Sequence, residues 1–143
     1  MKLGLCSIGA PSADEIKRVL LDPEIWERET DDHCGPASSF PGLPDTVRCL
    51  GGYVEDAIIG LAMTHKTEVG TKIHFAVLRP YRAHARAFLM RALEILGPVY
   101  CDIPECYRAV INFALHAGFV ATGRAGRYLK HGISHQRTRL CRS

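Results

Sequence analysis

The sequence predicts a mixed α/β protein in which one sheet carries helices on both faces. Its 143 residues suit a single domain over residues 1–143, large enough to bury a two-layer core. Hydrophobic residues make up 47% of the chain and charged residues 23%, as in an ordinary globular protein. Short apolar runs of strand length alternate with stretches of helical period, and this alternation is typical of a sheet layered with helices.

The first thirty residues predict a strand, a helix and then a further turn or short helix. Met1–Ile8 is short and apolar, and we interpret it as a strand because a secretory leader has a longer apolar core and a cleavage site. Ser12 stands three residues before a glutamate, the spacing of a capping box, so a helix is expected from there to about Leu21. Pro23 interrupts that helix, and either a turn or a second short helix is expected over Glu24–Thr30.

The segment Asp31–Thr46 has the composition of a long loop, with three prolines and two glycines. A loop of this length in a compact domain commonly has a function, such as covering a ligand. Its acidic start, Asp31-Asp32-His33, either steers a basic amine or is a solvated turn. Trp26 and Phe40 flank the loop, and they either form the floor of an acceptor pocket or serve as ordinary core anchors.

The middle of the chain predicts three successive strands and a helix. Val47–Glu55 and Ala57–Lys66 are apolar or alternating, with a tight turn between them, and Lys72–Leu78 follows after a further turn. The helix is expected over Ala87–Leu96, where the next two residues, Gly97-Pro98, stop it.

The last third predicts one more helix among short strands. A helix over Glu105–His116 would close at Gly118 as its left-handed cap. The β-like segments are Val99–Ile103, Phe119–Thr122, Arg127–Lys130 and Gln136–Cys141.

The turn between the apolar strand Ile73–Leu78 and the following helix carries the strongest chemical signal. Backbone N–H groups at a helix start are unpaired, and the helix dipole favours an anion there. Arg79, Arg82 and Arg86 add positive charge to this turn. The arrangement suits a pyrophosphate.

The same turn resembles the acyl-CoA-binding turn of the GNAT N-acetyltransferase superfamily. Two further segments resemble that superfamily in the same order along residues 12–125: its central hairpin and its helix end followed by Gly-Phe. The matching residues are Pro80 and Arg82-Ala83-His84-Ala85-Arg86-Ala87 for the turn, Leu50–Val54 and Ile58–Ala62 for the hairpin, and Ala114–Phe119 for the helix end.

This resemblance implies a GNAT-like fold with a mostly antiparallel sheet and an acyl-CoA-binding function. The implied activity is that of a transferase, an acetyl-CoA-dependent N-acyltransferase acting on an amine, with acetyl-CoA or CoA as cofactor and no metal. The strand Lys72–Leu78 would be bulged to position the thioester carbonyl, and its residues Ala76, Val77 and Leu78 would pair with the pantetheine. The pyrophosphate would be held by Arg82, Ala83, His84, Ala85, Arg86 and Ala87.

Three positions depart from the family pattern. Ala85 stands where a glycine lets the backbone approach the pyrophosphate, and Ala114 stands where many relatives carry the tyrosine that protonates the leaving thiolate. Tyr107 replaces an asparagine that often contacts the cofactor. The residues left for acid–base chemistry are His74 and His65 as candidate general bases, Glu68 and Glu55 as weaker ones, and Tyr81 and Tyr100 as candidate acids.

A narrower resemblance leaves a second function open. Asp22–Arg28 and Gly51–Val54 resemble small GNAT-like proteins of tailed bacteriophages, some of which are associated with head assembly or DNA ejection. The alternative is therefore a non-catalytic structural or interaction protein, such as a virion component whose partners are phage structural proteins or DNA. The expected location is the bacterial cytoplasm, or the virion for a phage protein.

Charge is unevenly distributed along the chain. Residues 1–78 carry 7 basic and 12 acidic side chains, whereas residues 79–143 carry 11 basic and 3 acidic ones. Six basic residues are interleaved with Tyr128 in the tail Arg124–Arg142. The basic half either binds a polyanion, a nucleotide cofactor or nucleic acid, or packs against the acidic half.

The remaining features bound the cofactors and partners. The six cysteines show no Cys-x-x-Cys spacing, so reduced thiols are expected rather than a metal site or disulfides. No run of about 18 apolar residues occurs, so no membrane span is expected. A homodimer could form through pairing of the last β-segment, Gln136–Cys141.

Overall fold

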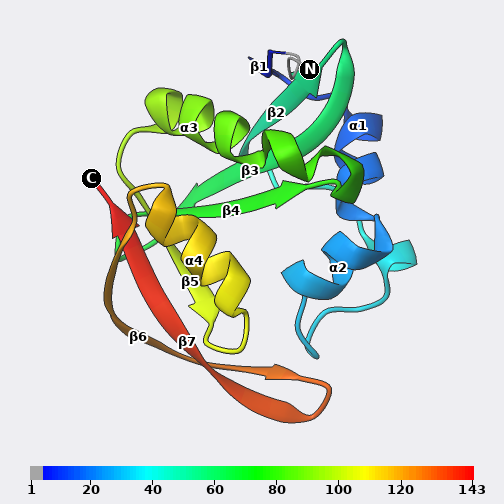
Figure 1. Cartoon of the computed structure of the whole chain (residues 1–143). Helices are drawn as coiled ribbons and strands as arrows, with labels where there is room; N and C mark the ends of the chain where they lie inside the picture. The colour runs from blue at the N-terminus through cyan, green and yellow to red at the C-terminus, as the bar shows by residue number, and fades with distance from the viewer. Residues whose placement is uncertain (1–4) are drawn as a thin grey trace.

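The computed structural model describes residues 5–143 and contains one sheet with helices on both faces (Figure 1). The described residues form a seven-stranded sheet in the order β1-β2-β3-β4-β5-β7-β6. Neighbouring strands are antiparallel except β4 and β5, which are parallel. The predicted fold class is therefore confirmed. The strands are β1 (Ser7–Gly9), β2 (Arg48–Val54), β3 (Ala57–Lys66), β4 (Thr71–Val77), β5 (Val99–Pro104), β6 (Val120–Lys130) and β7 (Ile133–Arg142).

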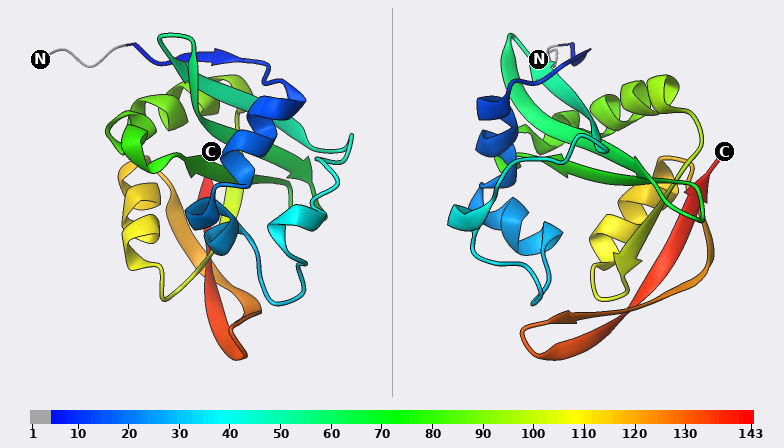
Figure 2. Two further views of the ribbon diagram at one scale, coloured as in Figure 1. Left: turned by 90° about the vertical axis from the view of Figure 1, so that its right-hand side faces the viewer. Right: turned by 180° about the vertical axis from the view of Figure 1, so that it is seen from behind.

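The helices divide into two pairs, one for each face of the sheet (Figure 2). Core residues of α1 and α2 pack with one face of β3 and β4, and those of α3 and α4 pack with the other. No helix in the described chain is long and apolar enough to cross a membrane. The helices are α1 (Ala13–Leu20), α2 (Pro23–Glu29), η1 (Ala37–Ser39), η2 (Arg79–His84), α3 (Ala85–Leu96) and α4 (Arg108–His116), where η marks a 3-10 helix.

The first two helices begin at the capping residue and the proline that the sequence predicted. The Ser12 hydroxyl accepts the backbone N–H of Glu15 at 3.1 Å, and the Glu15 carboxylate accepts that of Ser12 at 3.0 Å, so the capping box forms. Pro23 begins α2, whose first turn is capped by Asp22. Of the strand predicted over Met1–Ile8, residues 1–4 lie outside the described chain, and the described part begins at Ser7.

The tight turn between β2 and β3 uses two residues in the left-handed region. Glu55 has φ 51° and Asp56 has φ 66°, as a two-residue type I′ hairpin turn requires. The hairpin twists correctly although neither residue is glycine. At Gly52, a Cβ atom would lie 2.8 Å from the Phe88 ring, so this glycine lets α3 approach β2 closely.

The starts of two helices differ from the sequence-based expectation. The helix expected to begin at Ala87 begins at Ala85 and is preceded by η2, in whose first turn Pro80 needs no backbone N–H. The helix expected from Glu105 begins at Arg108, because the N–H of Tyr107 first closes a turn onto the Pro104 carbonyl.

The β-segments also differ in two places. The two short segments expected before residue 130 form one long strand, β6, which stays paired with β7 through register shifts around Gly123 and Gly126. The bulge expected in Lys72–Leu78 is not found, because the register between β3 and β4 runs unbroken from Gly60 with Val77 to Lys66 with Thr71. The register shift in this part of the sheet lies at Gly52/Tyr53, between β2 and β3.

The parallel pair β4 and β5 opens the sheet. Within the described chain, the two strands pair at a single position, Lys72 with Tyr100. Beyond that position β4 continues across the molecule while β5 turns away from it (Figure 1). The strands thus form a wedge whose closed end is at Lys72.

Candidate active site

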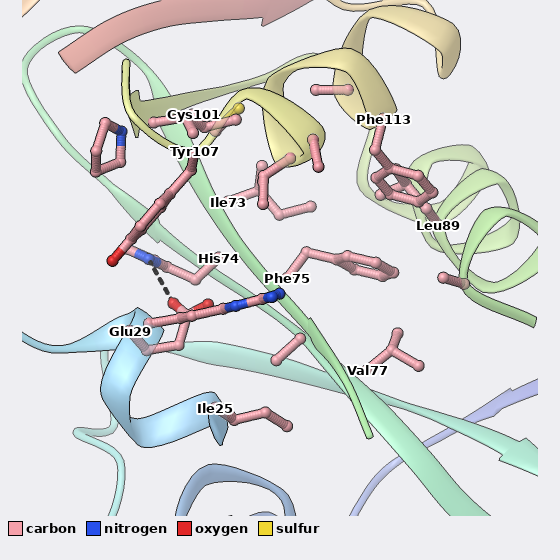
Figure 3. A pocket seen from close by; sticks show the side chains of 18 of the residues that line it. Ile25, Glu29, Ile73, His74, Phe75, Val77, Leu89, Cys101, Tyr107 and Phe113 are labelled. Carbon is pink, nitrogen blue, oxygen red and sulfur yellow. Dashed lines mark ion pairs between the residues drawn. The ribbon is translucent and has the colours of Figure 1, made fainter. Parts of the chain in front are cut away.

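A cavity of about 430 Å³ fills the wedge between β4 and β5 (Figure 3). Strand β4 contributes residues Ile73 to Val77, and β5 contributes Cys101 to Pro104. Helix α4 closes one side through Tyr107 to Ala114, and α2 closes another. This space is in the size range of small-molecule sites.

Buried charges close the narrow end of the wedge. Asp102, whose side chain is only 4% exposed, accepts two hydrogen bonds from Arg139 of β7, at 2.9 and 3.1 Å. Lys72 of β4 lies 3.5 Å from the same carboxylate. The Arg139 guanidinium also lies over the Tyr100 ring, 4.9 Å from its centre. Burial would raise the pKa of Asp102, but the hydrogen bond from Arg139 and the charge of Lys72 outweigh it and lower that pKa.

Strand β4 presents unpaired backbone groups to the cavity. The N–H of Leu78 donates to the Ile59 carbonyl at 2.8 Å, so residue 78 and every second residue before it face β3. The residues between them direct their N–H and C=O groups to the β5 side. Past the pairing with Tyr100, the backbone groups of Phe75 and Val77 therefore point into the opening. An extended ligand could pair there as an added strand.

One end of the cavity is apolar and the other is polar (Figure 3). The Phe75 ring packs against Phe88 with 5.1 Å between centroids and against Phe113 with 6.0 Å. Leu89 and Val77 extend this apolar wall.

The polar end brings together His74, Glu29 and Tyr107 (Figure 3). The Nδ1 atom of His74 lies 3.8 Å from a carboxylate oxygen of Glu29, the last residue of α2. Tyr107 projects from the start of α4, and its hydroxyl is 3.1 Å from that of Tyr128 on β6. The carboxylate and the imidazole are close enough to form an ion pair when the ring is protonated, and an imidazole that lines a cavity can act as a proton acceptor.

The two histidines predicted as bases lie together, but only one reaches the cavity. The rings of His65 and His74 are stacked with 5.4 Å between centroids and 10° between planes. His74 is among the cavity residues, whereas the described lining does not include His65. Burial, followed by the charges of His74 and Lys72, lowers the pKa of His65, which keeps that ring neutral. His74 is the better placed base.

The predicted pyrophosphate turn is only partly turned toward the cavity. Among its residues, Arg82 and Ala85 line the cavity. Ala83, Arg86 and Ala87 are exposed and His84 is half-buried, outside the lining. The N–H of Ala85 donates to the Arg82 carbonyl, so η2 uses part of the donor set expected to be unpaired.

The residues expected to pair with pantetheine have different surroundings. Ala76 and Val77 line the cavity. Leu78 is buried with α1 and α2, and its N–H is bonded to Ile59. By the strand alternation described above, Val77 has free backbone groups, and Phe75 joins it as a residue that sequence reasoning missed.

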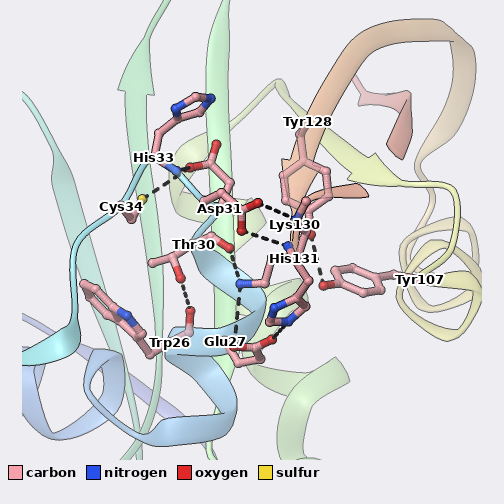
Figure 4. Close-up of polar contacts among 12 residues, drawn as sticks. Trp26, Glu27, Thr30, Asp31, His33, Cys34, Tyr107, Tyr128, Lys130 and His131 are labelled. Carbon is pink, nitrogen blue, oxygen red and sulfur yellow. Dashed lines mark hydrogen bonds and ion pairs between the residues drawn. The ribbon is translucent and has the colours of Figure 1, made fainter. Parts of the chain in front are cut away.

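The acidic and basic halves of the chain meet around α2 (Figure 4). Lys130, at the tip of the β6–β7 hairpin, is buried and donates to the Thr30 carbonyl at 2.6 Å. His131 lies 2.6 Å from the Glu27 carboxylate. The Asp32 carboxylate accepts the backbone N–H groups of His131 and Gly132 at 2.8 and 2.7 Å. The hairpin tip is thereby attached to the end of α2 and the start of the long loop.

The basic residues of the tail have contacts within the protein, and of the six only Lys130 contacts the described part of the acidic half. Each of the six has a partner within the described chain: Arg124 with Glu105, Arg127 with Ser134 and Gln136, Lys130 with Thr30 and Glu27, Arg137 with Ala125, Arg139 with Asp102, and Arg142 with Ala117.

The weaker candidates lie outside the cavity or have structural contacts. Glu55 and Glu68 are not among the described lining residues. The Tyr100 hydroxyl is hydrogen-bonded to Thr67. Tyr81 packs against both core clusters. The rings of Trp26 and Phe40 meet edge to face at 6.0 Å, and their indole and phenyl groups are packing partners.

Thiols and metal ligands are dispersed. All six cysteines are free, and Cys101 lines the cavity. Burial raises the pKa of the Cys101 thiol to about 12, so it stays protonated at neutral pH. Among residues 5–143, no group of three or more His, Cys, Asp or Glu side chains is arranged to hold a metal ion.

Sequence reasoning missed Glu29, Asp102 and the position of Tyr107. Asp102 carried a readable signal, since an acidic residue inside an otherwise apolar strand is buried only when it is paired. Glu29 carried none, because its relation to His74 depends on how α2 packs on β4.

Comparison with known proteins identifies the fold. No protein-family model matches the sequence, and no curated protein matches it. Among solved structures, a spermidine N-acetyltransferase from Vibrio cholerae in complex with CoA and spermine has a TM-score of 0.75 at 13% identity, over 95% of this chain and 94% of that chain. A Bacillus subtilis acetyltransferase in complex with CoA has a TM-score of 0.65 at 15% identity, over 97% of each chain. An N-acetyltransferase from Staphylococcus aureus Mu50 has a TM-score of 0.68 at 12% identity, over 98% of each chain. The chain therefore has the fold of GNAT acetyltransferases.

Proposed function

We propose that this protein is an acyl-CoA-dependent N-acyltransferase in which His74 is the general base. The observation that carries the proposal is the wedge between β4 and β5, where an apolar wall, unpaired strand backbone and a His–Glu pair meet in one cavity. Two of the structural neighbours were solved with CoA, which supports the choice of an acyl-CoA ligand.

The residues present fit two parts of such a ligand. The backbone groups of Phe75 and Val77 would hold the pantetheine arm, and Phe113 and Leu89 would pack against it. Arg82 of η2 lines the cavity just before α3, where the phosphates would lie. CoA would supply the acyl group as a thioester.

His74 would perform the first proton transfer. Its imidazole, with Glu29 beside the ring, would take a proton from the acceptor ammonium, and the free amine would form the new C–N bond as the C–S bond breaks. The attacking nitrogen would lose its second proton to solvent, and the leaving thiolate of CoA would take a proton from solvent. The acceptor is an amine, and the spermidine enzyme among the neighbours makes polyamines the first acceptors to assay.

The alternative is a non-catalytic protein of the same fold, such as a phage virion component. It is favoured by one observation: Ala114 lines the cavity where a proton-donating tyrosine would be expected, and alanine supplies no proton. The solved structures named above are acetyltransferases rather than phage proteins, which supports the enzyme.

The experiment that tests the proposal is acetyl transfer from acetyl-CoA to a panel of amines, including spermidine, followed by release of free thiol. Turnover by the wild type that falls about a hundredfold in His74→Gln supports it. His116→Gln is the matched control, because His116 is exposed at the end of α4. If the folded protein shows no turnover with any amine, the proposed N-acyltransferase activity is overturned and the non-catalytic alternative remains.

A further inference from the structure

One carboxylate at the edge of the cavity is surrounded by three guanidinium groups. Glu24 of α2 is ion-paired and hydrogen-bonded to Arg82 of η2. The Arg82 contact is made by Oε1 of Glu24, and Arg28, one turn further along α2, lies 3.5 Å from the same oxygen. The other carboxylate oxygen, Oε2, lies 3.8 Å from Arg79. Glu24, Arg28 and Arg82 all line the cavity.

This cluster resembles an oxyanion-binding site in which the Glu24 carboxylate takes the place of the bound anion. Guanidinium groups from two separate elements converge on a single pair of oxygen atoms, which is how arginines bind carboxylates and phosphates. The Glu24 side chain is 34% exposed, so solvent and a ligand can both reach it. A phosphate entering this end of the cavity would meet the same guanidinium groups that Glu24 now engages.

We infer that Glu24 is an internal competitor for the anionic part of the ligand, and that it sets the affinity of the cavity for phosphorylated acyl carriers. The identity of the ligand in this inference rests on the proposed acyl-CoA function. The direction of the expected change in affinity rests only on the contacts of Glu24. A phosphate group binds by replacing the carboxylate among Arg28, Arg79 and Arg82. Removing the carboxylate's charge removes the competition and one source of repulsion.

Substitution of Glu24 should affect ligand affinity in the opposite direction to substitution of a residue that binds the ligand. Loss of a side chain that contacts the ligand weakens binding, whereas Glu24→Gln should strengthen it. The gain should be confined to ligands that carry phosphate, because pantethine offers no group that competes with a carboxylate.

The test is calorimetric titration of the folded wild type, Glu24→Gln and the control Glu94→Gln with CoA, inorganic pyrophosphate and pantethine. Glu94 is exposed on α3, so its variant changes net charge equally without touching the cluster. We expect Glu24→Gln to bind CoA and pyrophosphate about tenfold more tightly than the wild type, with Glu94→Gln unchanged and pantethine binding equal in all three.

The outcomes separate this inference from the proposed function. Equal or weaker CoA binding by Glu24→Gln, with wild-type binding intact, overturns the competitor role and leaves the acyltransferase standing. If CoA binds none of the proteins, the acyl-CoA function fails, and pyrophosphate alone decides: tighter binding by Glu24→Gln supports the competitor role, and equal or absent binding overturns it. Arg79→Ala adds an independent check, since loss of this exposed guanidinium should weaken the pyrophosphate binding of Glu24→Gln.

Discussion

The Nζ atom of Lys72 on β4 lies 3.5 Å from Oδ2 of Asp102 on β5, at the end of the wedge where the two strands are still paired. The carboxylate also receives both hydrogen bonds from Arg139 of β7. Three strands are thus joined through one buried acid at the point from which the cavity opens. The shape of the site depends on this contact as well as on the backbone.

Asp102→Asn should destabilise the protein by about 3 kcal/mol, because it leaves two cations beside a buried neutral amide. The free energy of unfolding, measured by urea denaturation at pH 7, tests this. Glu94→Gln, at an exposed residue of α3, is the control. A change below 0.5 kcal/mol would show that solvent already screens the pair.

Protonation of the same carboxylate should lower the stability of the folded protein at low pH. The pKa of Asp102 is lowered in the folded protein, so its contribution is complete above the unfolded value near 3.9 and is lost as the pH falls through the folded value. The wild-type melting temperature should therefore fall below about pH 4 more steeply than that of Asp102→Asn. Parallel curves for the two proteins would refute this assignment.

Glu29→Gln should lower kcat without removing activity, because the Glu29 carboxylate lies beside the His74 ring and does not contact the reacting atoms. Steady-state kinetics of the variant and the wild type measure the effect. An unchanged kcat would show that Glu29 does not support the chemistry of His74.

The contact between the hairpin tip and α2 should loosen in acid. The hydrogen bond with His131 lowers the pKa of Glu27, and the backbone N–H groups of Gly132 and His131 lower that of Asp32. These contacts are complete above the ordinary carboxyl range and are lost as the pH falls through the lowered values. Hydrogen exchange of residues 128–134, corrected for the intrinsic rate, should therefore increase between pH 6 and pH 3. Asp32→Asn should show the increase already at pH 6, and identical protection at both pH values would contradict the contact.

Cys101 should report occupation of the cavity. With a pKa of about 12, its thiol should be alkylated at pH 8 much more slowly than the exposed Cys34 and Cys106, and CoA should slow it further. Mass spectrometry of iodoacetamide-treated protein measures each site separately. Equal labelling of Cys101 with and without saturating CoA would place the ligand elsewhere.

Local sequence signals predicted the elements well because each is set by neighbouring residues. The capping box at Ser12, the proline that begins α2 and the two-residue turn at Glu55 act over a few positions. The register shifts of β6 coincide with Gly123 and Gly126, where the sequence had suggested a break between strands.

The site was harder to predict because its contacts span the chain. Asp32 binds the N–H of Gly132 from 100 residues away, and Glu24 meets Arg82 across 58 residues. The sequence showed that an acidic half is followed by a basic half, but it could not show that Glu24 would occupy the arginines expected to hold phosphate. Pairings of this kind follow from how α2 packs on the sheet, which no local pattern encodes.

The most direct test of the account is calorimetric titration of the wild type and Ala85→Glu with CoA. Ala85 lines the cavity in the first turn of α3, so the variant places a carboxylate where the phosphates would lie. Ala121→Glu on the exposed strand β6 matches the change in charge. We predict stoichiometric, micromolar binding by the wild type and Ala121→Glu, and at least about tenfold weaker binding by Ala85→Glu. Absence of binding by the wild type at millimolar CoA would contradict the acyl-CoA site.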